Sequence, residues 1–191
     1  MRYLNVSGRV VFSFMVLTLL IDILMTHYAA HNQNNHFLVN LASLFEMTAF
    51  SFFFQNEIRN IKVRRIIHLL FTLYLAVFVY TFVWHKIMGH TLGLERGLLI
   101  IYVLLYFRHL LNEMRVHNLL IHSEFWISIG VLTYAAGTLF IYTFDVFASS
   151  IKEPNRFYWL LNFQLFFSSV LYITAGISFW LKAREVKLGI A

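Results

Sequence analysis

The stretch TLGLERGLLIIYVLLY, residues 91–106, combines a long apolar run with two adjacent charges near its start. From Leu98 onward every side chain is apolar or aromatic, whereas Glu95 and Arg96 stand just before this run. Such a run is typical of a helix that enters a lipid bilayer. The two charges then need a protein or water partner, because a charge at the bilayer centre costs about 2.5–3.5 kcal/mol.

The composition of the whole chain indicates an integral membrane protein. Of its 191 residues, 60% are hydrophobic and only 13% are charged, whereas an average soluble domain is about 25% charged. A soluble core of this size could not bury so much apolar surface, so lipid must cover much of it. The chain has no cysteine, which excludes disulfides, thiolate metal sites and cysteine nucleophiles.

Six apolar segments follow one another along the chain, each near the roughly 20 residues that a bilayer requires. They predict an all-α, polytopic transmembrane helical bundle with helices at residues 9–28, 37–56, 66–85, 91–112, 125–145 and 157–181. The connections are short, so we expect neighbouring helices to pack antiparallel. The chain is therefore expected to form a single integral membrane domain, residues 1–191.

Lysine and arginine concentrate on one side of the predicted helices. Of the 15 such residues, 11 lie before or at the start of the first helix, in or beside the second and fourth loops, or at the C-terminal end: Arg2, Arg9, Arg59, Lys62, Arg64, Arg65, Arg108, Arg115, Lys182, Arg184 and Lys187. The positive-inside rule therefore predicts that both termini lie in the cytoplasm. Topology also explains the net charge of +6, so no nucleic-acid partner is expected.

Most polar residues within the predicted helices fall in the outer half of the membrane in this orientation. They predict a pocket for a small ligand or ion formed by Asp22, Asn40, Glu46, Glu95, Arg96, Asn162 and Gln164. Arg96 is expected to reach Asp22 or Glu46, whereas Glu95, about 100° further round the helix, is expected to face another helix or water. Two interpretations stay open: an outward-facing polar pocket, and an ion-pair clasp that fixes helix register.

A histidine pair provides a candidate metal site. His27 and His31 in HYAAH are four residues apart and would share one helical face, a spacing that metal sites use. Asp22 is near enough in sequence to complete an intramembrane zinc site. However, the chain has no nucleophile elbow, phosphate-binding glycine loop or His-Glu-x-x-His motif. The sequence therefore favours a non-enzymatic role and predicts no cofactor.

Small residues predict close packing of the fifth and sixth helices. They are Gly130, Ala135, Ala136 and Gly137 on the fifth helix, and Ser168, Ser169, Ala175 and Gly176 on the sixth. Residues of this size let helix backbones approach each other in a membrane, where no hydrophobic force draws helices together.

The pattern LERGLLIIYVLLYFRHLL followed by HNLLIHSEFWISIGVLTYAAGTLFIY resembles a group of small, largely uncharacterised bacterial multi-pass membrane proteins. The elements that carry the resemblance are Glu95-Arg96, Tyr106-Phe107, Asn118-Leu119, Phe125-Trp126-Ile127 and Gly130 with Tyr134. It implies a seven-helix protein of the bacterial cytoplasmic (inner) membrane, often associated with two-component signalling. The chain begins at what corresponds to the group's second helix, so one further N-terminal helix is expected. Relatives also place the arginine before the glutamate, the reverse of the order in this chain.

These observations predict a sensory or accessory membrane protein whose outward-facing pocket relays a signal to a cytoplasmic partner, such as a histidine kinase. One alternative is a small transporter or an ion or proton pathway that uses Glu46. Another is an intramembrane zinc hydrolase that uses His27, His31 and Asp22. The lipid bilayer is the remaining expected partner, and a homo-oligomer is left open.

Overall fold

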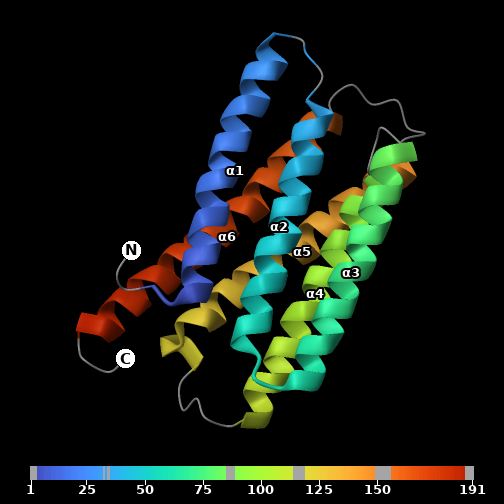
Figure 1. Cartoon of the computed structure of the whole chain (residues 1–191). Helices are drawn as coiled ribbons and strands as arrows, with labels where there is room; N and C mark the ends of the chain where they lie inside the picture. Colours follow the sequence, from blue (N-terminus) through green and yellow to red (C-terminus); the bar gives the residue numbers. More distant parts are fainter. Residues whose placement is uncertain are drawn as a thin grey trace. The chain divides into compact units, whose positions relative to one another are not determined.

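A computed structural model of the chain describes residues 4–31, 33, 35–84, 89–113, 119–148 and 156–187. Every regular element in these ranges is a helix (Figure 1). The elements are α1 (Val6–Ala30), α2 (His36–Glu57), α3 (Ile61–Trp84), α4 (Gly89–Glu113), the short 3₁₀ helix η1 (Leu119–Ile121), α5 (Ser123–Ala148) and α6 (Arg156–Lys187). The all-helical fold and the six long helices predicted from the sequence are confirmed.

Five of the six long helices could cross a membrane by their length and apolar character. Within the described residues these segments are Val6–Tyr28, Phe37–Glu57, Ile61–Phe82, Ser123–Thr143 and Asn162–Glu185. Helix α4 is not among them. Its uninterrupted apolar run, residues 97–107, extends about 16 Å, whereas the hydrocarbon core is about 30 Å thick. If α4 crosses a membrane, charged residues at one end of this run or at both, Glu95 with Arg96 or Arg108, must therefore lie within the hydrocarbon region.

Helices α1 and α3 begin earlier than the sequence predicts, because asparagine side chains cap them. The Asn5 side-chain oxygen accepts a hydrogen bond from the Gly8 backbone N–H at 2.8 Å. Asn60 does the same for the Lys62 backbone N–H at 2.9 Å. Such caps satisfy backbone donors that a helix start leaves unpaired. They extend both helices into polar sequence, beyond the apolar segments that set the predicted starts at residues 9 and 66.

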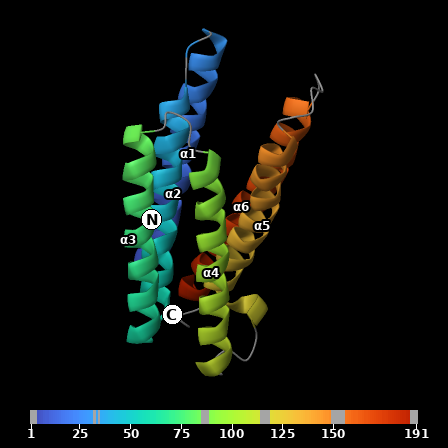
Figure 2. The same cartoon turned by 90° about the vertical axis from the view of Figure 1, so that its right-hand side faces the viewer.

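The helices fall into two compact units, with the division between residues 91 and 92. In the α1–α3 unit, α2 packs against both α1 and α3 (Figures 1 and 2). Helix α2 is also the most enclosed of the three: 56% of the residues in its apolar stretch are buried, against 17% for α1 and for α3. Thus α2 forms the core of this unit, while α1 and α3 present most of their apolar side chains outward. The organisation as a single domain stays a prediction.

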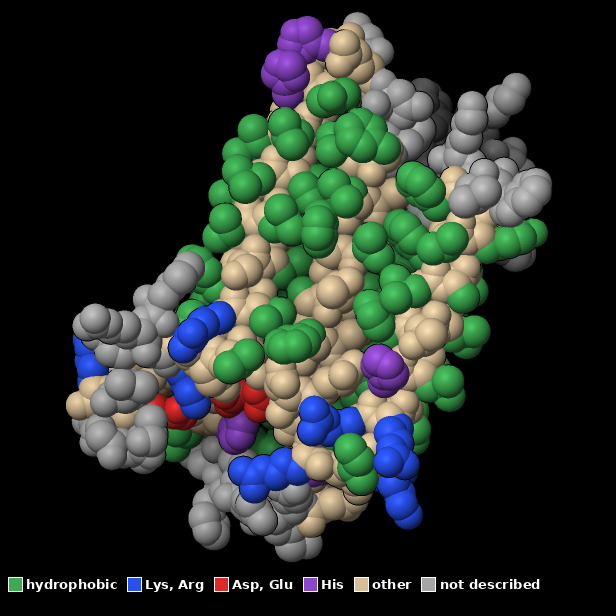
Figure 3. All heavy atoms as spheres, viewed as in Figure 1, with side chains coloured by type: hydrophobic (Ala, Val, Ile, Leu, Met, Phe, Trp, Pro, Cys, Tyr) green, Lys and Arg blue, Asp and Glu red, His purple; other side chains and the backbone are tan. Residues whose placement is uncertain are grey.

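Apolar side chains extend along α1, α2 and α3 on the face drawn in Figure 3. Lysine and arginine gather at the end where α1 begins, α2 ends and α3 begins, and histidine lies at the opposite end of α1. The exposed basic residues at this end are Arg9, Arg59, Lys62, Arg64 and Arg65. A basic end next to an apolar belt is the distribution that a membrane-embedded helical unit requires.

In the α4–α6 unit, α5 and α6 pack together along most of their length. A side chain at Gly130 would collide with Thr174, and one at Gly137 would come within 2.5 Å of the Phe167 ring. Advancing along α5 therefore means moving back along α6, as antiparallel packing requires. The two glycines let the helices approach closely.

The predicted small-residue contact is correct for only some of its members. The two glycines of α5 lie against α6, and Ala135 and Ala175 are fully buried. The prediction is wrong for Ala136, Ser169 and Gly176, which are exposed. Each of these lies one position after a more buried residue, and one position turns a side chain by about 100° around the helix.

Candidate functional site

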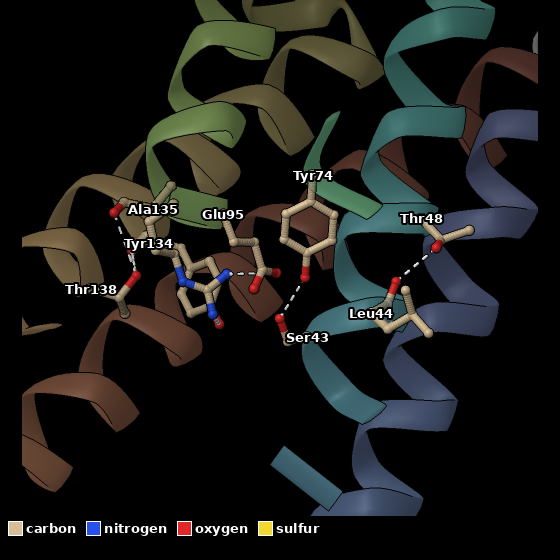
Figure 4. Close-up of polar contacts among 9 residues, drawn as sticks. Ser43, Leu44, Thr48, Tyr74, Glu95, Tyr134, Ala135 and Thr138 are labelled. Carbon is tan, nitrogen blue, oxygen red and sulfur yellow. Dashed lines mark hydrogen bonds and ion pairs between the residues drawn. The ribbon is translucent and has the colours of Figure 1, made fainter. Parts of the chain in front are cut away.

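Arg96 on α4 is the centre of a buried polar cluster in the α4–α6 unit. Only 3% of this residue is exposed. Its Nη2 donates a hydrogen bond to the hydroxyl of Tyr134 on α5 at 2.8 Å, and its Nη1 lies 3.4 Å from Oε1 of Glu95 (Figure 4). The guanidinium carbon is 4.5 Å from the centre of the Tyr134 ring and 5.9 Å from that of Tyr142. Arg96 therefore binds its neighbours through both its edge and its planar face, which lysine could not do.

Tyr134 reaches the cluster because it lies on the buried face of α5. This face also contains residues at spacings of three and four: Val131, Ala135, Thr138 and Ile141, all 6% exposed or less, as residues on one side of a helix must be. The Thr138 hydroxyl donates to the backbone oxygen of Tyr134 at 2.6 Å (Figure 4). Thr138 thus satisfies its own polar group within the helix and leaves the tyrosine side chain to Arg96.

Glu95 is completely buried. The sequence predicts that it faces another helix or water, and the structure overturns the second of these alternatives. Glu95 pairs instead with the adjacent Arg96, whose long side chain spans the angular offset between the two positions. The 3.4 Å separation is longer than the usual range for a strong charge-assisted hydrogen bond, about 2.7–2.9 Å. This contact is therefore mainly an attraction between opposite charges in a site that excludes water.

A second polar group lies in the α1–α3 unit, on the buried face of α2. Asn40, Ser43 and Glu46 are 7%, 4% and 6% exposed, and their three-residue spacing places them along one side of the helix. The Ser43 hydroxyl lies 2.8 Å from the hydroxyl of Tyr74 on α3, within hydrogen-bonding distance (Figure 4). This contact ties α2 to α3 at the level of the polar group.

The buried face of α2 becomes apolar after Glu46. The side chains that follow on this face are completely buried: Met47, Phe50, Phe53 and Phe54. Ser51 is the one buried polar side chain in this half of α2. Helix α2 thus has a polar first half and an aromatic second half, as the clustering of polar residues in the sequence predicts.

The remaining predicted pocket residues are less enclosed. Asp22 is exposed on α1, beside the exposed Leu19 and Ile23. On α6, Asn162 is exposed and Gln164 is half-buried. The pairing of Arg96 with Asp22 or Glu46, and the gathering of all seven residues into one pocket, stay predictions.

The two candidate metal ligands lie at the end of α1, where His27 is in the last turn of the helix and His31 is one residue beyond it. The rings of His27 and His31 are 4.4 Å apart, and Nδ1 of His31 lies 2.9 Å from the backbone oxygen of His27. Asp22 lies about 140° further round the helix from His27, because five positions separate them. Among the residues that the structure describes, no group of three or more His, Asp or Glu side chains could hold a metal.

A third polar group, which was not predicted from the sequence, joins the start of α5 to the end of α6. Glu124 is 7% exposed and accepts a hydrogen bond from the Ser123 hydroxyl at 2.7 Å. Its carboxylate lies 3.0 Å from Nδ1 of His122 and 3.6 Å from Nζ of Lys182 on α6. Lys182 also pairs with Glu185 at 3.0 Å. These contacts connect the turn before α5 with the last turns of α6.

Tyrosines and a serine that bind within these groups are not among the residues predicted from the sequence. Tyr134, Tyr74 and Ser43 are all buried, and a buried tyrosine hydroxyl usually finds a partner. A tyrosine in the middle of an apolar segment was therefore the available signal. Ser43 had a similar signal, since it stands midway between Asn40 and Glu46 at helical spacing.

A search against models of protein families, and searches of curated proteins and of solved structures, find no match to this chain. The resemblance to a group of bacterial seven-helix proteins therefore stays a prediction.

Proposed function

We propose that this chain is a sensory or accessory protein of the bacterial cytoplasmic membrane, with both termini in the cytoplasm and α4 as a sixth membrane span. In this proposal, the polar residues of the outer half respond to a small ion or ligand, and the helices transmit the response to a cytoplasmic partner. The observation that supports it best is the buried Arg96, held by Glu95 and by Tyr134.

The contacts of Arg96 make it suitable for a response of this kind. Its hydrogen bond to Tyr134 is short, whereas its separation from Glu95 is long for a charge-assisted bond. An anion that approaches Nη1 would therefore displace Glu95 before Tyr134. A proton that neutralises Glu95 would weaken the same contact between Arg96 and Glu95. Because the site is buried, such a change alters the electrostatic energy far more than it would in water.

Helix α5 provides a route from Arg96 to the opposite end of the unit. Tyr134 and Glu124 are ten residues apart on α5, about 15 Å along the axis. Between them Gly130 lies against Thr174 of α6, and at the far end Glu124 faces Lys182. A helix shift of about 1–2 Å, the size known from signalling interfaces, would change the pairing of Glu124 with Lys182. In the proposed orientation this end faces the cytoplasm, where a partner such as a histidine kinase would detect it.

The alternative of a transporter that uses Glu46 has less support. A transport path needs polar groups that continue toward the other side of the membrane. The buried face of α2 beyond Glu46 is instead almost entirely aromatic and aliphatic. This arrangement favours a response that stays in one half of the membrane.

The proposal can be tested by measuring distances between spin labels, because the chain has no native cysteine. One label pair, Leu120→Cys with Lys187→Cys, reports on the end near Glu124. A second pair, Phe140→Cys with Phe163→Cys, reports on the opposite end of α5 and α6. All four positions are exposed. The labelled protein in nanodiscs is titrated with sodium chloride, sodium formate and choline chloride, and with acid.

We expect at least one of these additions to shift the distance between positions 120 and 187 by about 1–2 Å. Arg96→Gln, Tyr134→Phe or Glu46→Gln should abolish the shift, while Tyr28→Phe on α1 should leave it intact. If the first three variants lower the melting temperature but leave both label distances and their responses unchanged, the cluster is a structural clasp. The sensory proposal would then be wrong.

A further inference from the structure

A groove with a volume of about 410 Å³ runs between α1 and α2. Its α1 wall is formed by residues at helical spacing from Val6 to Leu17, and its α2 wall by residues from Phe45 to Phe52. Both helices belong to the α1–α3 unit. The volume lies within the range of about 300–1,000 Å³ that is usual for ligand sites.

The groove exists because small side chains lie at its centre and bulky ones surround them. Ser13, Thr48 and Ala49 line the groove, with Phe45 and Phe52 one helical turn before and after the α2 pair. The Thr48 hydroxyl donates to the backbone oxygen of Leu44 at 2.7 Å. The threonine therefore needs no polar partner from a ligand, and the groove offers an almost entirely apolar surface.

One end of the groove carries a positive charge. Arg9 lines the groove and is exposed, close to the start of the membrane-spanning segment Val6–Tyr28. Residues near this boundary lie at the depth of the lipid phosphates. The N–H of Gly8 is already used by the Asn5 cap, so the arginine, rather than the helix start, is the group that would hold an anion.

The length of the groove indicates which apolar molecule it fits. From Val6 to Leu17 the helix rises about 16 Å, which is close to half of the roughly 30 Å hydrocarbon core. A transmembrane helix from a second copy would need a groove that continues across the whole core. A lipid acyl chain occupies one leaflet only, with its phosphate at the surface.

We propose that the α1–α2 groove binds one acyl chain of an anionic phospholipid, with Arg9 pairing with the phosphate. Contacts along the groove walls supply van der Waals attraction that the small central side chains leave unused. The charge of Arg9 supplies the preference for an anionic headgroup. The bound lipid fills the contact between α1 and α2 and should stabilise the α1–α3 unit.

The test is lipid binding to the purified full chain in detergent, measured by native mass spectrometry. Phosphatidylglycerol is the anionic probe, and phosphatidylcholine of the same acyl length is the zwitterionic one. Arg9→Gln should weaken binding of phosphatidylglycerol about fivefold, the factor that corresponds to about 1 kcal/mol for one basic group near a lipid surface. Binding of phosphatidylcholine should weaken less, because its choline cation offsets the charge of its phosphate. Lys62→Gln, an equal loss of charge at the same end of the unit, should have no effect.

A second pair of variants tests the groove itself. Thr48→Leu fills the groove from an exposed position and should weaken the binding of both lipids. Thr72→Leu is the matched control, because Thr72 is also exposed and donates to a backbone oxygen on α3. Melting temperatures of all variants verify folding. If Arg9→Gln does not fold, Arg9→Lys replaces it. Arg9→Lys should retain the preference for phosphatidylglycerol.

Three results would overturn the inference. Equal losses in Arg9→Gln and Lys62→Gln would mean that charge attracts the lipid without a defined site. Binding of glycerol phosphate as tight as that of phosphatidylglycerol would mean a simple anion site. Unchanged lipid binding in Thr48→Leu, with a dimer of the wild type lost instead, would mean that a second copy occupies the groove.

Discussion

Arg96 and Tyr134 contact each other in two ways: the arginine donates a 2.8 Å hydrogen bond to the tyrosine hydroxyl, and its guanidinium carbon lies 4.5 Å from the ring centre. The two residues are 38 positions apart in the sequence and belong to α4 and α5. This double contact joins α4 to α5 at a buried position. It also makes the two contributions separable by mutation.

Replacing Tyr134 by phenylalanine removes the hydrogen bond and keeps the ring beneath Arg96. We expect Tyr134→Phe to lower the free energy of unfolding by about 1.5–3 kcal/mol, the range for hydrogen bonds to a charged group. Tyr134→Leu should cost about 0.5–2 kcal/mol more, since the cation–π contact is lost as well. Unfolding in detergent by guanidinium chloride measures both. Tyr28→Phe is the control, because the ring contact of Tyr28 with Phe37 at 5.7 Å survives the change.

The ion pair of Arg96 should appear as an energetic coupling in a double-mutant cycle. Arg96→Ala alone leaves buried Glu95 without its cation, which should cost about 3–5 kcal/mol. Adding Glu95→Gln should recover part of this loss. If the stability losses of Arg96→Ala and Glu95→Gln simply add, Glu95 does not hold Arg96. Ion pairing would then not explain why the two charges are adjacent in the sequence.

The same cycle tests the partners predicted from the sequence. Glu46 is buried, whereas Asp22 is exposed. A buried carboxylate needs a cation or hydrogen-bond donors to compensate its charge, whereas an exposed carboxylate is solvated by water. The sequence predicts that Arg96→Ala couples with Glu46→Gln or with Asp22→Asn. Additive losses in both cycles would mean that neither carboxylate is a partner of Arg96.

The apolar segments predict the helices well and their ends poorly, for a reason that α6 illustrates. Hydropathy ends this helix at residue 181, but it continues to Lys187, because the last turns contain good helix formers. Arg184 and Lys187 there also complement the negative end of the helix dipole. A prediction from hydropathy locates the apolar part of a helix. The helix itself continues as far as helix propensity and capping allow.

The candidate site was predictable by residue type and not by partner. The sequence predicts that Asp22, Glu46, Glu95 and Arg96 face protein or water. Glu46, Glu95 and Arg96 are buried, whereas Asp22 is exposed. The sequence does not predict that Arg96 folds back on its neighbour or meets Tyr134, since this depends on the side chain that α5 turns toward α4. The role of Glu124 was not predictable for the same reason, because only the packing of α6 against α5 brings Lys182 close to it.

Gly130 and Gly176 provide a matched pair for testing the contact between α5 and α6. A Cβ at Gly130 would collide with Thr174, whereas a Cβ at Gly176 has no neighbour within 4 Å. The Thr174 hydroxyl is also fixed by bonds to the backbone of Val170 and Leu171 at 3.0 Å, so it cannot move away easily. Gly130→Ala should therefore destabilise the protein by about 1–3 kcal/mol.

Gly176→Ala should instead stabilise it by about 0.4–1 kcal/mol, because alanine restricts the unfolded chain and favours the helix. Thermal unfolding of the two variants gives the comparison. Thr174→Ala should partly rescue Gly130→Ala. Equal effects of the two glycine variants would show that helix propensity, rather than close packing, governs this contact.

The predicted orientation can be tested by labelling single cysteines with a charged, membrane-impermeant thiol reagent. Gln33 and Lys62 are exposed near opposite ends of the α1–α3 unit, and Leu73 is exposed in the apolar part of α3. The positive-inside rule predicts that Gln33→Cys reacts in intact cells and that Lys62→Cys reacts only after the membrane is opened. Leu73→Cys should react in neither case, because lipid covers it, and should react after unfolding in detergent.

Labelling of Lys62→Cys in intact cells would reverse the orientation and place the polar residues of α2 in the cytoplasmic half, which removes the basis for an outward-facing sensor. Labelling of Leu73→Cys in intact cells would mean that α3 does not cross the membrane.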